Sequence, residues 1–145
     1  MKKFLVSFLI LSLMFGAAAC GSCGGREDEI SNGTGIVFAG GETSYSIVIS
    51  ESSSETVAYA AQELSSFVRQ ATGVSLPVVR DAASPAHYIS LGDTQQYVSA
   101  AISFDAIALR HDGFILREKG GNLYIAGEND RGILYGVYDF LERFA

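Results

Sequence analysis

The sequence predicts an α+β domain in which a mostly antiparallel sheet carries two amphipathic helices on one face. Three observations predict it. Apolar residues recur every three or four positions in two segments, 57–71 and 133–144, which is the spacing of a helix with one buried stripe. Short runs rich in β-branched residues separate these segments. Two such runs flank the glycine-bearing loop 118–122, which is typical of a β-hairpin and makes the alternative, a small doubly wound parallel fold, the weaker prediction.

The first strand and the first helix are the clearest elements. Residues 45–50, Tyr-Ser-Ile-Val-Ile-Ser, form a strand because they are rich in β-branched side chains. Ser52 and Glu55 have the spacing of a capping box at the start of the helix, and Gly73 ends it because glycine adopts the left-handed conformation readily. The helix is expected to bury a stripe of seven residues: Val57, Ala60, Ala61, Leu64, Phe67, Val68 and Ala71.

The remaining elements follow in the order strand, turn, strand, short helix, hairpin, helix. The first four are expected at residues 76–79, 81–85, 88–91 and 94–101, and residues 102–112 show no clear period. The hairpin strands are expected at 114–117 and 123–126. Asn129 or Asp130 caps the last helix through its side-chain oxygen, and the stripe of that helix is Ile133, Leu134, Val137, Tyr138, Leu141 and Phe144.

The N-terminus has the pattern of an export signal. Lys2 and Lys3 precede an apolar run of twelve residues, too short for the roughly 20 that a membrane-spanning helix needs. Ala17, Ala18 and Ala19 then lead directly to Cys20, which resembles the lipobox of bacterial lipoproteins. That resemblance implies a signal peptide at 1–19 and a Cys20 that becomes the acylated N-terminus of a protein exported to the bacterial cell envelope, on its periplasmic or surface side.

Cys20 and Cys23 have alternative interpretations. Simple secretion is one, and a redox pair or half of a zinc site is another. Zinc needs four ligands, and the only histidines, His87 and His111, lie far along the chain. The glycines around the two cysteines are typical of a linker, so residues 20–44 are predicted to be a lipidated cysteine with a flexible tether, and Cys23 receives no role.

Charge excludes some partners. The 145 residues hold 10 basic and 16 acidic side chains, and removal of residues 1–19 takes away two of the basic ones, which leaves a net charge of −8. Nucleic acids and anionic membranes are bound through basic patches, so neither is an expected partner. The membrane is expected to be reached only through the lipid.

Several short motifs together resemble a known domain. Its helix reads Ala-Tyr-Ala-Ala-Gln-Glu-Leu at 58–64 and Gln-Ala-Thr-Gly at 70–73. Further motifs are Leu-Pro-Val at 76–78, Ile-Ser-Leu-Gly at 89–92, Asp-Gly-Phe-Ile at 112–115 and Gly-Ile-Leu-Tyr-Gly-Val-Tyr at 132–138. Residues 45–145 resemble the N-terminal domain that precedes the catalytic barrel in bacterial alpha-glucuronidases and beta-hexosaminidases.

The resemblance implies a non-catalytic accessory domain of an exported, lipid-anchored glycoside hydrolase that degrades polysaccharides, with the beta-hexosaminidase domain 2-like arrangement of one sheet and two helices. It implies that the catalytic carboxylates belong to a barrel domain absent from residues 1–145, so the chain is expected to be a fragment or a truncated reading frame. The alternative is a stand-alone surface lipoprotein module that binds a glycan or a partner protein. Whether the chain is itself an enzyme stays open.

No catalytic, cofactor-binding or metal-ligating residue is predicted, and no cofactor. Glycoside hydrolysis needs two carboxyl groups across a sugar. The acids that come closest to such a pattern are better explained as helix-terminus, solvated or loop residues: Glu128, Asp130, Asp139, Glu142, Asp105 and Asp112. His87 and His111 have no nearby nucleophile. Gly132 and Gly136 indicate close packing of the last helix, since each costs a helix about 1 kcal/mol.

Aromatic residues give a weaker signal for carbohydrate. The chain has no Trp, and its seven Tyr are expected to be core or half-buried. Tyr97 is the candidate for a loop tyrosine that meets a sugar. If the chain is an accessory domain, an exposed apolar patch is expected on its last helix.

Overall fold

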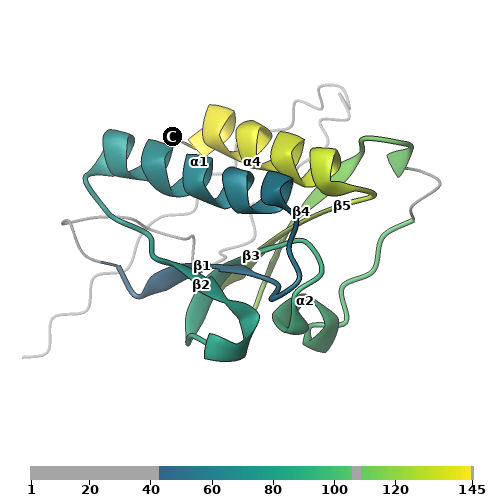
Figure 1. Ribbon diagram of the computed structural model, residues 1–145, viewed down its shortest axis with the longest axis horizontal. Helices are drawn as coiled ribbons and strands as arrows, with labels where there is room; N and C mark the ends of the chain where they lie inside the picture. Colours follow the sequence, from purple (N-terminus) through teal and green to yellow (C-terminus); the bar gives the residue numbers. More distant parts are fainter. Residues whose placement is uncertain (1–42, 106–108, 145) are drawn as a thin grey trace, which may run out of the picture. The chain divides into compact units, whose positions relative to one another are not determined.

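The computed structural model describes residues 43–105 and 109–144, which belong to one compact unit. Figure 1 shows two long helices over a single sheet. The elements are β1 (Tyr45–Ile49), α1 (Glu55–Thr72), β2 (Val78–Arg80), η1 (Asp81–Ala83), β3 (His87–Leu91), α2 (Gln95–Ser99), β4 (Phe114–Lys119), β5 (Asn122–Gly127) and α4 (Asp130–Phe144). The predicted signal peptide, Cys20, Cys23 and the linker up to residue 42 lie outside the described residues.

The α+β class and the two helices on one face are confirmed, but the prediction of a mostly antiparallel sheet is wrong. The strand order is β2-β1-β3-β5-β4, and β1 is parallel to both β2 and β3. The pair β3–β5 is also parallel, so only the hairpin β4–β5 is antiparallel. The reason is the connection through α1, because a strand that returns to the sheet after a crossover helix runs parallel to the strand before it. The fold is still not doubly wound, since α1 and α4 share one face (Figure 1).

Helix α1 is capped by a different serine from the one predicted. The Ser54 hydroxyl accepts a hydrogen bond from the Val57 N–H at 3.3 Å, while the Ser52 hydroxyl contacts Ser50 instead. Ser54 has the extended backbone that an N-cap needs, which places the cap two residues later. The predicted end is confirmed: Gly73 has φ +78°, and its N–H bonds to the Arg69 carbonyl at 2.9 Å.

The core lies between the sheet and the two helices. Ile47, Ile89 and Ile125, from β1, β3 and β5, belong to one buried cluster with residues of α1 and α4, and Ile125 lies against Gly136 of α4. Five of the seven predicted stripe residues of α1 are buried, but Phe67 is 43 % exposed and Ala71 is exposed as well, since both lie at the margin of the stripe. The buried hydrophobic side chains described in α4 are Ile133, Val137, Phe140 and Leu141, so Phe140 joins the core while the predicted Tyr138 leaves it. Of the other predicted stripe residues, Leu134 is half-buried, and the side chain of Phe144 lies outside the described part of the chain.

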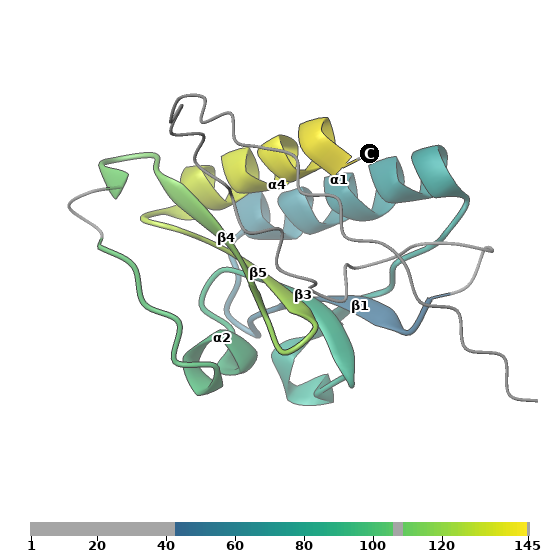
Figure 2. The same ribbon diagram turned by 180° about the vertical axis from the view of Figure 1, so that it is seen from behind.

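The hairpin is confirmed, with a tighter turn than predicted. Figure 2 shows its two strands, which extend to Lys119 and Asn122 and leave only Gly120 and Gly121 between them. Both glycines have positive φ, +61° and +77°. A two-residue hairpin turn with positive φ at both positions matches the right-handed twist of the strands.

Helix α4 begins where predicted and lies very close to the sheet. The Asn129 side-chain oxygen accepts from the Gly132 N–H at 2.9 Å, so of the two proposed caps Asn129 is the one used. A Cβ placed on Gly132 would lie 2.6 Å from the Gly113 carbonyl oxygen, and one on Gly136 would lie 2.6 Å from Ile125 Cγ2. The close packing predicted from these two glycines is therefore confirmed.

The shorter elements follow the prediction with small shifts. Helix α2 forms within the predicted 94–101, and β3 contains the predicted 88–91. Strand β2 starts two residues later than predicted, because Pro77 has no N–H and only its carbonyl pairs, with the Ile47 N–H at 2.8 Å. Among the described residues, no helix combines the length and the apolar character needed to cross a membrane.

Candidate functional site

The outer side of the helix layer carries four exposed aromatic side chains. Tyr59 and Phe67 lie two turns apart on α1, and Tyr135 and Tyr138 lie one turn apart on α4. Their exposed fractions are 49, 43, 44 and 38 %. The two helices contact each other along the layer (Figure 1), so these residues form one surface, which we call the aromatic face.

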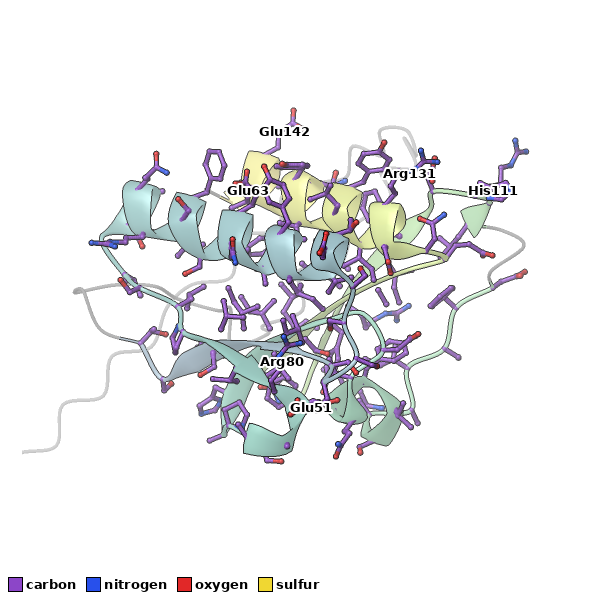
Figure 3. All side chains as sticks on the ribbon, in the orientation of Figure 1. Glu51, Glu63, Arg80, His111, Arg131 and Glu142 are labelled. Atoms are coloured by element: carbon purple, nitrogen blue, oxygen red, sulfur yellow. The ribbon has the colours of Figure 1, made fainter. Side chains whose placement is uncertain are left out.

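Polar groups join the two helices within the aromatic face. The Tyr138 hydroxyl donates to Glu63 Oε2 across the helix pair at 3.3 Å. Figure 3 shows Glu63 and Glu142 on the side of the layer that faces away from the sheet. The pKa of Tyr138 is raised to about 12, mainly by hydrogen bonding with Tyr59 and then by burial. The nearby Tyr59 and the charge of Glu63 contribute further. The hydroxyl therefore stays protonated and remains a donor at physiological pH.

Such a surface suits protein contact. Tyrosine supplies large apolar area with a polar tip and is enriched where proteins associate. Because helices α1 and α4 are held by a packed core beneath them, the four rings are presented on a firm base. The patch expected on the last helix is present in Tyr135 and Tyr138, and α1 extends it.

Three of the acidic residues singled out in the sequence, Asp112, Asp130 and Asp139, hold structural positions. Asp112 forms an ion pair with Arg131 at 3.0 Å, and this pair ties the segment before β4 to the start of α4. Figure 3 shows Arg131 and His111 together at that end of the molecule. Asp139 pairs with Arg143 at 2.8 Å, one turn along the same helix. Asp130 opens α4, where a carboxylate favours the positive end of the helix dipole.

Neither histidine has the surroundings of a base. His87 is exposed and its ring lies 5.3 Å from the ring of Tyr45, centroid to centroid. His111 is exposed, and its carbonyl accepts a hydrogen bond from the Asn129 amide. In the part of the chain that the structure describes, no three His, Cys, Asp or Glu side chains are placed to hold a metal ion.

Tyr97 does not offer the loop platform that was considered for a sugar. It lies in α2 and is half-buried, and its ring centroid is 6.5 Å from that of Tyr124. Burial, with the Asp93 carboxylate second, raises its pKa above the ordinary value. The expectation that the tyrosines are core or half-buried therefore holds for Tyr45, Tyr88, Tyr97 and Tyr124, and it is wrong for the three tyrosines of the aromatic face.

Comparison with known proteins places this fold among carbohydrate-active enzymes. A family model described as "Glycosyl hydrolase family 67 N-terminus" matches residues 41–140. The chain belongs to this family, and the resemblance to the N-terminal domain of glycoside hydrolases of the alpha-glucuronidase type is thereby confirmed.

Curated relatives carry the same segment within much longer chains. The "Probable alpha-glucuronidase A" of Aspergillus oryzae is 31 % identical over 100 residues, which cover 68 % of this chain and 12 % of the relative. The "Alpha-glucuronidase" of Hypocrea jecorina is also 31 % identical over 100 residues, covering 66 % of this chain and 12 % of the relative. The chain thus spans about one eighth of the length of the relatives it matches.

A solved structure shares the fold. It is described as a family GH115 4-O-methyl-alpha-glucuronidase with specificity for decorated arabinogalactans, and it superposes with a TM-score of 0.57. The match covers 73 % of this chain and 14 % of that one, at 20 % sequence identity. At that identity the likeness shows the arrangement of helices and strands alone.

Proposed function

We propose that this chain is the accessory domain of an exported, lipid-anchored glycoside hydrolase and that its aromatic face packs against the catalytic domain. The observation that carries the proposal is the aromatic face itself. Four large aromatic side chains are exposed on two helices that contact each other, and a contiguous exposed apolar patch is typical of an interaction site. Membership of the glycosyl hydrolase family 67 N-terminus supports a catalytic domain as the partner.

The interface would have a polar centre within an apolar surface. The Tyr138 hydroxyl donates to Glu63 across the two helices, and burial of the Glu63 carboxylate would require a donor or cation from the catalytic domain. Tyr59, Phe67 and Tyr135 supply the apolar area around this pair. Under this proposal the domain positions and supports the catalytic domain, and the two carboxyl groups that cleave the glycosidic bond belong to that domain.

Reading the coding sequence beyond Ala145 is the first test. We expect a catalytic domain in the same frame. The longer protein and the 145-residue chain are then exposed to hydroxyl radicals, and oxidation of each tyrosine is measured by mass spectrometry. Tyr59, Tyr135 and Tyr138 should be oxidised in the short chain and protected in the longer one, while the buried Tyr124 serves as an internal control in both. Equal oxidation in both proteins, or a stop codon with no catalytic domain downstream, would overturn the proposal.

We also propose that Cys20 carries the lipid, on the strength of the sequence pattern from Lys2 to Cys20. Cells that express the full chain are grown with an alkyne-labelled fatty acid, and the protein is tested for label. Cys20→Ser should abolish labelling, whereas Cys23→Ser, three residues away, should leave it unchanged. Label that survives Cys20→Ser would contradict the assignment.

A further inference from the structure

The centre of the aromatic face holds a carboxylate, that of Glu63. Helices α1 and α4 run in the same direction (Figure 1), and the hydrogen bond between Tyr138 and Glu63 shows which turns of the two helices lie side by side. On α1, Tyr59 lies one turn before Glu63 and Phe67 one turn after it. On α4, Tyr135 lies one turn before Tyr138. The carboxylate is therefore flanked by rings along both helices.

Glu63 has no cation within the described part of the chain. Its carboxylate takes part in no ion pair there, and its one hydrogen bond comes from Tyr138. The arginines of the two helices are engaged or lie elsewhere: Arg131 and Arg143 of α4 pair with aspartates, and Arg69 of α1 lines a hollow on the side of strand β2. Any surface that covers the aromatic face therefore meets an uncompensated carboxylate.

The tyrosine hydroxyl satisfies only part of this carboxylate. An ionised carboxylate has about four lone-pair sites that accept hydrogen bonds. Tyr138 donates its single O–H to Glu63 Oε2 at 3.3 Å, and this hydroxyl carries no charge at physiological pH. The described residues give Glu63 Oε1 no donor. Burial of the carboxylate without a further donor is costly, because a buried charge needs a partner.

We propose that an arginine side chain of the catalytic domain occupies the centre of the aromatic face and pairs with Glu63. The assignment rests on the proposed function, because it names the group by which the catalytic domain recognises the face. A guanidinium carries five N–H donors in a planar fork, and it gives a carboxylate two parallel hydrogen bonds. It also stacks on aromatic rings, which Tyr59 and Tyr138 supply next to Glu63.

A lysine or an uncharged donor fits this centre less well. A lysine ammonium is a strongly hydrated point charge without the planar fork, and an uncharged donor leaves the negative charge of Glu63 uncompensated in a dry interface. Glu142 offers a contrast within the same surface. It lies one turn after Tyr138, is exposed, and faces away from the sheet (Figure 3). A cation that meets Glu142 stays in water, so that contact contributes little.

The longer protein encoded by the gene tests this proposal with two reagents. Hydroxyl-radical oxidation of Tyr59 and Tyr135 measures whether the aromatic face is covered, and phenylglyoxal, which modifies accessible guanidinium groups, measures the exposure of each arginine by mass spectrometry. We expect one arginine of the catalytic domain to be protected in the parent protein and to react about tenfold faster in Glu63→Gln. Glutamine keeps an acceptor for the Tyr138 hydroxyl and removes only the charge. Glu142→Gln, the same change at the exposed site, is the matched control and should leave the protection unchanged.

The outcomes separate the arginine from the proposed function. If Tyr59 and Tyr135 are protected but every arginine of the catalytic domain reacts equally in the parent and in Glu63→Gln, the face is covered and only the arginine assignment is overturned. A carbodiimide cross-link from Glu63 to a lysine overturns it as well, because this reagent joins carboxylates to amines. If both tyrosines are oxidised as in the 145-residue chain, the proposed function falls too. Low oxidation of the buried Tyr124 confirms that each variant is folded.

Discussion

The face of the sheet under α1 and α4 is filled by aliphatic side chains, whereas the opposite face, towards α2, combines the buried Val48 with paired hydroxyl groups. On the helix side, Ile47, Ile89 and Ile125 belong to one cluster of buried hydrophobic residues with α1 and α4. On the other side, the hydroxyls of Ser90 and Thr94 pair at 2.6 Å. The hydroxyls of Tyr88 and Tyr124 pair at 2.8 Å, with the two rings edge to face.

The difference has an energetic consequence. Aliphatic burial adds stability roughly in proportion to area and tolerates small shifts of position. A buried hydroxyl pair adds little net stability, but the loss of one partner leaves the other unsatisfied. The helix side should therefore determine how stable the domain is, and the hydroxyl side should determine how precisely the loop after β3 is held.

The largest effect is expected for Leu64→Ala. Leu64 is fully buried in the centre of α1, so the substitution leaves a cavity and should lower the free energy of unfolding by about 2–5 kcal/mol. Phe67→Ala, one turn away but 43 % exposed, is the control and should cost about 1 kcal/mol or less. Urea denaturation of the two variants measures both. Equal losses would mean that the buried stripe is not the main source of stability.

On the hydroxyl side, Tyr88→Phe should be worse than the double variant Tyr88→Phe/Tyr124→Phe. Tyr124 is 2 % exposed, and its burial, with the Tyr88 hydrogen bond second, raises its pKa above the ordinary value. Removing only the Tyr88 hydroxyl leaves the Tyr124 hydroxyl without this partner, which should lower the free energy of unfolding by about 1–3 kcal/mol. Removing both should recover most of that loss, because two apolar rings of the same shape remain. A double variant as unstable as the sum of the singles would show that the pair does not act together.

Gly136→Ala tests the close approach of α4 to the sheet. Alanine improves helix propensity by about 1 kcal/mol, but its Cβ would meet Ile125 Cγ2 at 2.6 Å and the Phe114 ring at 3.2 Å. Overpacking costs about 1–3 kcal/mol, so we expect a net loss of about 1 kcal/mol. Gly73→Asn is the contrasting control: Gly73 has open space and φ +78°, which Asn tolerates. A more stable Gly136→Ala variant in thermal melts would contradict the packing argument.

The contrast between the two faces also explains what the sequence could predict. An apolar residue at every third or fourth position predicts a helix with one buried side, so both long helices were predictable from local residues. The caps at Gly73 and Asn129 were also predictable, because they depend on the residue type at each helix end. The predicted direction of most strands was wrong, although two features of the sequence favour parallel strands. Ile47-Val48-Ile49 is apolar without alternation, which suits a strand buried on both faces, and a helix follows it directly. The hairpin determines the direction of one strand pair only, whereas the strand–helix–strand unit makes β1 and β2 parallel.

The aromatic face and the buried polar residues were harder to predict, for two physical reasons. Tyrosine has an apolar body and a polar tip, so Tyr138 fits a helix stripe by spacing and yet lies at its exposed margin. The burial of Asp81 could not be predicted from the residues beside it in the sequence. Its hydrogen bonds are made with Gln95 and Gln96, which lie fourteen and fifteen residues away on another element. Such burial becomes visible only when those elements are placed together.

The smallest effect is expected from Glu63→Gln, which changes the charge of the aromatic face without removing a ring. In the folded chain the pKa of Tyr138 is about 12, above the ordinary value of 10. The raised pKa means that its stabilising contribution is complete below pH 10 and is lost as the pH rises towards 12. Glu63→Gln removes a charge that disfavours the tyrosinate, so the pKa should move back towards 10, and the loss of stability should be confined to a narrower pH range. NMR of chains labelled at tyrosine Cζ follows this titration, with Tyr138→Phe identifying the signal. If Glu63→Gln leaves the titration unchanged, the Glu63 carboxylate does not control that hydroxyl, and the contact with Tyr59 is its main determinant.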